Sequence, residues 1–414
     1  MNSFDDSDEK NVRHIPSRKK FMEISSANLF SALTQQPARM DALAKGALSN
    51  GIRLYQDGDY NGAASEFRRA IALSPASEDA VSAYDYLATA FLQLGKTPEA
   101  LGAYQSALRL APGREDLHVK FGNILLEEKK YTEALKEYKA ALQLNPTSTA
   151  NLYSLGQAYL AMGDLSGAKA VFNQITDLAP GNYGGYYGLG QTYYREGEYE
   201  KAVEQFQNVI SIDEQFSYVY LDLGYAYANL GRVDDANAQV KILEEKDPSM
   251  AATLSRYIYR VAPPEFLLAY SDSGFGFTLG PRTPLSAMDP SLATPDASVQ
   301  LSMKFIFNKK MENASVENPF HWMISRASWG SNGGAYNYGL PVPQTEVTLP
   351  AFPTRITYDP QNLKAEVFFT VTQNSSANGT LDPSHIIFRF YGQDAYGNSM
   401  NLSRDEFGGI SKIV

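Results

Sequence analysis

Residues 115–146 read EDLHVKFGNILLEEKKYTEALKEYKAALQLNP, and the pattern of this stretch recurs along the chain. Within it, the small residue Gly122 is followed twelve residues later by Ala134. The aromatic residue Tyr138 comes four residues after that alanine, and Pro146 ends the unit. A proline lacks the amide hydrogen that a helix needs and disfavours helical geometry in the residue before it. The stretch therefore predicts two helices that end at this proline.

The same four positions recur in six units, with intervals of 37, 34, 34, 34 and 34 residues. The small residues are Gly51, Ala88, Gly122, Gly156, Gly190 and Gly224. The alanines are Ala63, Ala100, Ala134, Ala168, Ala202 and Ala236. The large residues are Phe67, Tyr104, Tyr138, Phe172, Phe206 and Val240. The terminal positions are Pro75, Pro112, Pro146, Pro180, Glu214 and Pro248.

The period has a direct physical meaning. A small residue on the first helix and an alanine on the second let the helices approach closely, while the large residue fills the gap between hairpins. This spacing resembles the tetratricopeptide repeat family over residues 44–250. The resemblance implies an α-solenoid of six helical hairpins. Three extra residues before the second unit, within residues 76–80, predict a longer turn between repeats.

The segments around the repeats differ from them in composition. Residues 1–20 are polar and of mixed charge, which predicts a flexible tail. Apolar residues at roughly helical spacing in residues 21–43 predict an amphipathic helix that caps the solenoid, with a docking helix as the alternative. Residues 251–297 are rich in proline and glycine, and we interpret them as a linker or a wrapped loop.

Residues 298–414 favour a second domain of β-structure. In VQLSMKFIF at residues 299–307, apolar residues alternate with mainly polar ones, as in a strand with one buried face. Turn residues separate further candidates. The further predicted strands are residues 321–326, 345–349, 354–358, 364–373 and 385–391. This number of short strands fits an antiparallel β-sandwich, so the predicted fold class is α plus β in two or more domains.

Two stretches of the β-rich domain carry a second resemblance. FIFNKKMENASVENPFHWMI at residues 305–324 and IIFRFYGQDAYGNSM at residues 386–400 are similar to motifs of the bacterial immunoglobulin-like domains of surface-layer proteins. The resemblance implies an immunoglobulin-like sandwich. The chain departs from that pattern at residues 327–353, a long insertion rich in glycine and proline.

Composition excludes several classes of function. The net charge of −10 and a pI near 5.1 argue against nucleic acid as a partner. The sequence has no cysteine, which excludes disulfides, thiolate metal sites and cysteine nucleophiles. No apolar run is long enough for a membrane-spanning helix, and the acidic N-terminus does not resemble a secretory signal. These features predict a cytoplasmic protein, with the cell surface as the alternative that the immunoglobulin-like resemblance implies.

Motifs for catalysis, metals or cofactors are not apparent, so the sequence predicts no catalytic residue, no metal site and no cofactor. Four scattered histidines do not have the spacing of metal ligands. DGDYNG at residues 57–62 imitates a calcium loop, but Arg68 stands where the bidentate glutamate belongs. We interpret it as a turn, and we interpret GQDAYGN at residues 392–398 as a turn with a calcium site as the alternative. Asp and Glu are too common for paired carboxylates to be recognised, which leaves glycoside hydrolysis open.

The family resemblance implies that the first helix of each hairpin lines a concave groove. Positions along these helices are rich in tyrosine and side-chain amides, which suit an extended peptide because amides hydrogen-bond its backbone and tyrosines bury its side chains. The predicted groove residues are Asn123, Tyr153, Gln157, Tyr187, Gln191, Tyr194, Tyr218, Leu221 and Tyr225. The alternative is that several of these tyrosines pack between helices or against the chain's own linker.

Two functions fit these features. The first is a non-enzymatic scaffold or adaptor whose solenoid binds a protein or peptide partner. The second is a structural appendage protein of the cell surface or flagellum, exported without a classical signal peptide. The sequence does not determine the oligomeric state, since sheet edges could pair with a second copy but nothing requires it.

Overall fold

The computed structural model describes residues 18–272, 275–329 and 334–408, with side chains described from residue 36 onward. The chain divides into two compact units, Met1–Glu196 and Gly197–Val414. The boundary falls within the fifth predicted repeat. The two domain boundaries predicted at residues 250 and 297 both lie inside the second unit.

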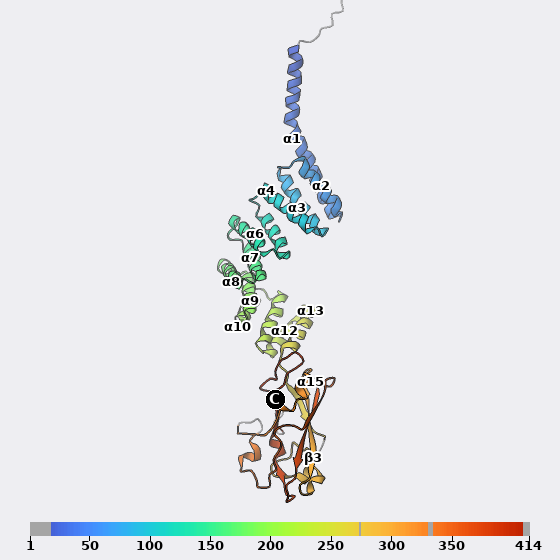
Figure 1. Ribbon diagram of the computed structural model, residues 1–414. Coiled ribbons are helices and arrows are strands. Elements are labelled where there is room, and N and C mark those ends of the chain that lie inside the picture. The colour runs from blue at the N-terminus through green and yellow to red at the C-terminus, as the bar shows by residue number, and fades with distance from the viewer. Residues whose placement is uncertain (1–17, 273–274, 330–333, 409–414) are drawn as a thin grey trace, which may run out of the picture. The chain divides into compact units, whose positions relative to one another are not determined.

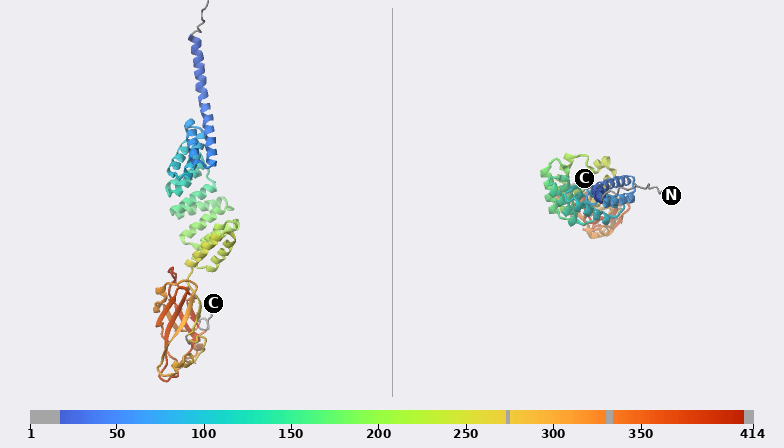
Figure 2. Two further views of the ribbon diagram at one scale, coloured as in Figure 1. Left: turned by 90° about the vertical axis from the view of Figure 1, so that its right-hand side faces the viewer. Right: turned by 90° about the horizontal axis from the view of Figure 1, so that it is seen from above.

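The first unit is built of antiparallel helical hairpins (Figure 1). Its helices are α1 Arg18–Gln56, α2 Tyr60–Leu73, α3 Glu78–Gln93, α4 Thr97–Leu110, α5 Glu115–Glu127, α6 Tyr131–Leu144, α7 Thr149–Met162, α8 Leu165–Leu178 and α9 Tyr183–Glu196. Each odd-numbered helix from α1 to α7 packs against the even-numbered helix that follows it, as Figure 2 shows. The predicted hairpins of this unit are confirmed.

Two of the repeated glycines show how closely the helices of a hairpin pack. Gly122 on α5 lies against Tyr138 on α6, so closely that a Cβ atom at Gly122 would come within 2.8 Å of the ring. At Gly156 on α7 the corresponding distance to the Phe172 ring is 2.5 Å. Real Cβ contacts are longer, and a side chain at either glycine would therefore force the helices apart.

The segment at residues 57–62 is a turn, as predicted. Gly58 adopts a left-handed conformation with φ of +84°, which glycine reaches without steric cost. Asp59 is the N-cap of α2, and its carboxylate accepts a hydrogen bond from the Gly62 amide at 2.8 Å. The carboxylate of Asp57 forms an ion pair with Arg53.

The helix predicted at residues 21–43 is continuous with the first helix of the repeats. Both belong to α1, which has 39 residues and contains Pro37. The boundary predicted at residue 43 therefore falls inside one helix. The tail predicted at residues 1–20 lies outside the described residues, except for its last three, which begin α1.

The second unit begins with helices and continues into β-structure. Its helices are α10 Tyr199–Ile212, α11 Ser217–Asn229, α12 Val233–Lys246 and α13 Pro248–Val261, followed by the one-turn helices α14 Leu285–Met288 and α15 Asn313–Val316. Helix α13 lies in the segment interpreted as a linker. Asp247 caps its start, Pro248 occupies the first helical position, and Leu254 and Ile258 are buried.

The β-region consists of antiparallel strands. They are β1 Phe266–Tyr270, β2 Thr283–Pro284, β3 Ser298–Phe307, β4 Trp322–Arg326, β5 Arg355–Asp359, β6 Lys364–Thr372, β7 Thr380–Leu381, β8 Ile386–Phe390 and β9 Glu406–Gly408. The sheets have the strand orders β1-β3-β6-β5, β4-β8-β9 and β2-β7. Short 3₁₀ turns connect them: η1 Pro290–Ala293, η2 Pro319–His321, η3 Tyr336–Gly339 and η4 Pro383–His385.

Most of the predicted strands of this region are confirmed, because β3, β4, β5, β6 and β8 fall on predicted segments. The strand predicted at residues 345–349 is wrong: the structure has an isolated bridge there, between Glu346 and Thr380. The prediction missed β1, inside the presumed linker, and the short strands β2, β7 and β9. Two- and three-residue strands are too short to show an alternating pattern.

A single aromatic core joins the two larger sheets. The ring of Phe305 on β3 lies 5.1 Å from that of Trp322 on β4 and 5.6 Å from that of Phe388 on β8. Phe369 on β6 also contacts Phe388 at 5.4 Å. These side chains are completely or almost completely buried. The structure thus establishes an antiparallel β-region, while its immunoglobulin-like identity stays a prediction.

Candidate functional site

The first helices of the hairpins in the first unit are joined to one another by polar side chains. Lys120 on α5 donates to Asp85 on α3 at 2.7 Å. Asn151 on α7 donates to Glu115 on α5 at 2.7 Å. These bonds bridge consecutive repeats, and they fix the relative positions of helices that a 34-residue period places side by side.

Two predicted groove residues form such a bridge. The Nε2 atom of Gln157 on α7 donates to Oε1 of Gln191 on α9 at 3.1 Å. Both side chains are half-buried. An amide has two donors and two acceptor lone pairs, so this bond leaves each glutamine with further capacity for a ligand.

The other predicted residues of the first unit differ in exposure. Asn123 is exposed, and its Oδ1 accepts a hydrogen bond of 2.7 Å from the hydroxyl of Tyr138. Tyr153 and Tyr194 are half-buried, and the Tyr153 ring lies 5.8 Å from that of Phe172. Tyr187 is only 8% exposed, which fits the alternative of packing between helices.

Asp85 is a further polar group on the same helices. Its Oδ2 atom binds Lys120, whereas its Oδ1 atom is buried without a hydrogen-bond partner within the described residues. Asp85 occupies the fifth position of its repeat, as Tyr153 does in the fourth repeat. Asp85 also interacts with Tyr104: burial raises the pKa of Tyr104 to about 12, and the Asp85 carboxylate adds to this shift.

Three predicted residues lie in the second unit. Tyr218 is 56% exposed, and its ring is 5.9 Å from that of Phe216. Leu221 and Tyr225 are half-buried. The Tyr225 ring makes an edge contact of 4.6 Å with Tyr257 on α13. Burial raises the pKa of Tyr225, and the nearby Asp222 and Tyr257 add to this shift.

Sequence reasoning missed Tyr257 as a neighbour of the predicted site. Its hydroxyl donates to Asn229 at 3.1 Å, in addition to the contact with Tyr225. The signal was present in α13, because the buried residues Ala251, Leu254 and Ile258 have helical spacing. The prolines and glycines that follow this helix favour a linker instead.

The loop at residues 392–398 is a turn, as predicted. Asp394 accepts hydrogen bonds from the amides of Tyr396 and Asn398, each at 2.8 Å. It also forms a buried ion pair with Lys309 at 2.6 Å. Its charge is thus already compensated within the chain. Across the part of the chain that the structure describes, no three acidic or histidine residues are grouped as metal ligands.

The β-region also contains a buried polar cluster that links residues distant in sequence. Asp382 accepts hydrogen bonds from the Asn337 amide at 2.7 Å, from Ser384 at 2.8 Å and from His385 Nδ1 at 2.7 Å. Ser384 Oγ lies 3.0 Å from that same nitrogen atom. A charge-relay triad needs serine and aspartate on opposite nitrogens of the histidine, so this arrangement is not one.

A carboxyl group with an unusual pKa belongs to the same region. Glu346 bonds to the Tyr336 hydroxyl, and its side chain is 3% exposed. Burial raises the pKa of Glu346 to about 7; Arg326, at 3.6 Å, opposes this shift, and Asp382 adds to it. The cluster ties the 327–353 insertion to the loop before β8.

Comparison with protein families identifies the helical hairpins. Models described as tetratricopeptide repeat match residues 48–115, 87–149 and 125–191, and one described as TPR repeat matches residues 190–231. Residues 48–231 are tetratricopeptide repeats. This fold is typical of non-catalytic scaffolds that bind proteins or peptides.

Solved structures show similar helical repeats. A tetratricopeptide repeat protein from Parabacteroides merdae is 20% identical, with a TM-score of 0.48, over 52% of this chain and 86% of that one. The pilF protein of Pseudomonas aeruginosa is 22% identical, with a TM-score of 0.41, over 53% and 99%. YrrB, described as a TPR protein with an unusual peptide-binding site, is 22% identical, with a TM-score of 0.38, over 45% and 94%.

No curated protein matches the chain. Within the described residues, the structure contains no helix with the length and apolar character needed to cross a membrane.

Proposed function

We propose that the tetratricopeptide repeats bind an extended peptide segment of a partner protein on their first helices. The observation that carries the proposal is the bond between Gln157 and Gln191, which aligns two amides from consecutive repeats. Amides at matching positions of successive repeats suit the backbone of an extended peptide, because its donors and acceptors also recur at regular intervals.

One neighbouring residue supports the proposal. Tyr153, which is half-buried, offers part of its ring for contact with an apolar side chain of a ligand. Tyr187 has almost no exposed surface, and we assign it to packing rather than to binding.

The test begins with selection of peptides from a random display library on the immobilised full chain. Affinities of the selected peptides are then measured by fluorescence anisotropy for the wild type and for the double variant Gln157→Ala/Gln191→Ala. Loss of two hydrogen bonds is expected to weaken binding by roughly 10-fold to 100-fold. Circular dichroism must show an unchanged helix content.

The matched control is Gln143→Ala, which removes an exposed amide from α6, a second helix of a hairpin. Its affinity should stay within about twofold of the wild type, as is usual for a residue outside a binding site. Equal affinities of the double variant and the wild type would contradict peptide binding through Gln157 and Gln191. Failure to select any peptide would contradict the peptide class itself.

A further inference from the structure

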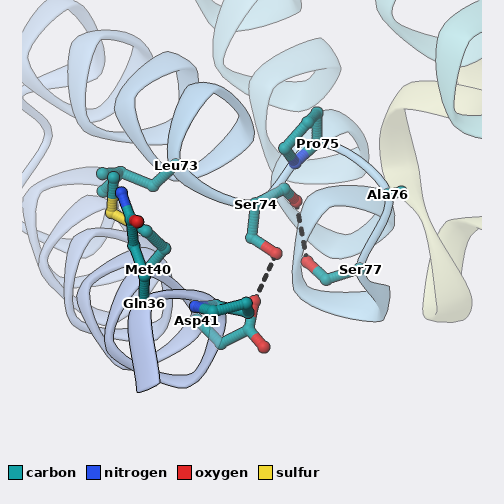
Figure 3. A pocket seen from close by; sticks show the side chains of 9 residues that line it. Gln36, Met40, Asp41, Leu73, Ser74, Pro75, Ala76 and Ser77 are labelled. Carbon is teal, nitrogen blue, oxygen red and sulfur yellow. Dashed lines mark hydrogen bonds between the residues drawn. The ribbon is translucent and has the colours of Figure 1, made fainter. Parts of the chain in front are cut away.

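A buried charge defines a more specific site in this chain than an open hollow does. A hollow of about 540 Å³ lies beside α1 and is lined by residues of α1 and by residues 73–77 (Figure 3). It is open to solvent, and the Asp41 carboxylate at its edge already accepts a hydrogen bond from Ser74 Oγ at 2.5 Å. Lys309 is a charged side chain with only 2% of its surface exposed. A buried ammonium group is costly unless its surroundings replace water, so the surroundings of Lys309 form a cation site.

These surroundings come from two segments of the second unit. Asp394, in the loop after β8, contacts the Lys309 nitrogen Nζ through Oδ2 at 2.6 Å. The carbonyl oxygen of Ala262, the C-cap of α13, accepts a hydrogen bond from Nζ at 2.7 Å. The ring centroids of Tyr259 and Tyr396 lie 5.2 Å and 5.4 Å from Nζ. A carboxylate, a carbonyl oxygen and the faces of two aromatic rings all attract a cation.

The C-terminus of α13 adds to this attraction. Carbonyl groups in the last turn of a helix have no partner within the helix, and they form the negative end of its dipole. The carbonyl of Ala262 receives Lys309, and the carbonyl of Arg260 receives the side-chain nitrogen of Asn398. The lysine and the loop at residues 392–398 therefore meet the helix where a positive charge is favoured.

The groups around Nζ suit an ammonium group better than a calcium ion, which takes about six to eight oxygen ligands. Among the described residues, Nζ of Lys309 has two oxygen partners, from Asp394 and Ala262. Asn398 adds no third oxygen, because its side-chain nitrogen donates to Asp394 Oδ2 at 2.8 Å and to the Arg260 carbonyl at 2.7 Å. Both of these partners are acceptors, so the network fixes the nitrogen of this amide, rather than its oxygen, toward the carboxylate.

We infer that the loop at residues 392–398 and the C-terminus of α13 form a binding site for a primary ammonium group, and that Lys309 is its ligand within the chain. The ammonium nitrogen takes the place that a metal ion would take if this loop bound calcium. Because Lys309 is tethered, its effective concentration at the site exceeds that of free cations. The contact between α13 and the β-region is therefore made without a metal ion.

The variant Lys309→Ala empties the site on the full chain, and n-propylammonium replaces the removed atoms one for one. Urea unfolding followed by tryptophan fluorescence is measured in n-propylammonium chloride and in NaCl of the same ionic strength. At about 50 mM ligand, a dissociation constant of about 10 mM would raise the folding equilibrium constant of the variant about sixfold. The wild type should show no difference between the two salts, because Lys309 fills its site.

The matched control is Lys310→Ala, which removes the exposed neighbouring lysine and should not respond to n-propylammonium. The double variant Lys309→Ala/Asp394→Asn lacks the carboxylate and should lose the response. If Lys309→Ala does not fold in NaCl, n-propylammonium should restore the fluorescence of the folded state. An equal effect of 1-propanol would overturn the inference, because it would show an apolar cavity, and so would an equal response of the wild type.

Calcium provides a second test, on the wild type itself. We use about 5 mM CaCl₂, which exceeds the dissociation constants of about 0.1–1 mM of weak calcium modules. The fluorescence transition should stay where NaCl of the same ionic strength leaves it. A stabilisation that is specific to Ca²⁺ and is abolished by Asp394→Asn would assign the loop to a metal ion and overturn the inference.

Discussion

At the scale of single residues, the glycines of the first helices are requirements of packing rather than of backbone freedom. Gly156 lies in the middle of α7, and the space for its missing side chain is filled by the ring of Phe172. Gly102 on α4 is different, because a Cβ atom there would meet no other atom within 4 Å. The two glycines should therefore respond in opposite ways to substitution.

We expect Gly156→Val to lower the free energy of unfolding of the first unit by about 1–3 kcal/mol, because the added methyl groups must displace the Phe172 ring. Gly102→Ala should raise it by about 0.5–1 kcal/mol through helix propensity. Urea unfolding followed by circular dichroism at 222 nm measures both. A stabilising Gly156→Val would contradict the packing explanation.

Glu346 predicts a pH dependence of the β-region. Its pKa is raised from 4.5 to about 7 in the folded state by burial, so the folded protein binds this proton more tightly than the unfolded chain. The resulting stability is present below about pH 4.5 and is lost as the pH rises through 7. We expect the free energy of unfolding to fall by about 1–3 kcal/mol over this interval.

The matched variant is Glu346→Gln, which stays neutral and retains an acceptor for the Tyr336 hydroxyl. Urea unfolding at pH 5 and pH 8, followed by tryptophan fluorescence, should show a smaller pH difference for this variant than for the wild type. An identical difference in both proteins would show that other groups cause the dependence.

At the scale of elements, helix α13 connects the repeats of the second unit to the β-region through specific contacts. Lys309 is 2% exposed, and its ammonium group binds Asp394 and donates to the Ala262 carbonyl at 2.7 Å. Asn398 donates to the Arg260 carbonyl at 2.7 Å. Carbonyl groups at the C-terminus of a helix lack partners within it, so the β-region satisfies groups that α13 leaves free.

Lys309→Met should lower the free energy of unfolding of the second unit by about 3–5 kcal/mol, because it leaves Asp394 buried without its cation. The double variant Lys309→Met/Asp394→Asn should regain part of this loss, since it removes the unpaired charge. Tryptophan fluorescence during urea unfolding measures both. Equal losses in the single and double variants would mean that the ion pair itself contributes little.

At the scale of the whole molecule, the division into two units predicts two unfolding transitions. Both tryptophans, Trp322 and Trp329, lie in the β-region, whereas most helices belong to the repeats. Tryptophan fluorescence therefore reports on the second unit, and circular dichroism at 222 nm reports mainly on the helices. Units with separate cores need not unfold together.

We expect the urea transitions measured by these two signals to differ in midpoint. Gly156→Val should shift the dichroism transition and leave the fluorescence transition in place. Lys309→Met should shift the fluorescence transition. A single transition that coincides in both signals, and that both variants shift equally, would show that the whole chain unfolds as one cooperative unit.

The repeat architecture could be predicted from the sequence alone, because a hairpin of 34 residues needs small residues at fixed positions, and these recur along the chain. The longer strands could also be predicted, such as β3, in which apolar residues alternate with mainly polar ones over residues 299–307. Both patterns are local, so they can be recognised in the sequence without knowing which segments pack together.

Features that depend on contacts between distant residues became visible only in the folded structure. It showed that Gln157 bonds to Gln191, that Tyr187 is buried, and that α13 packs on α11 and α12. The cluster of Glu346 and Asp382 likewise joins residues far apart in the chain. Burial and hydrogen bonding are properties of the assembled packing, and a side chain of the same type at the same repeat position can therefore bind a ligand or fill the core.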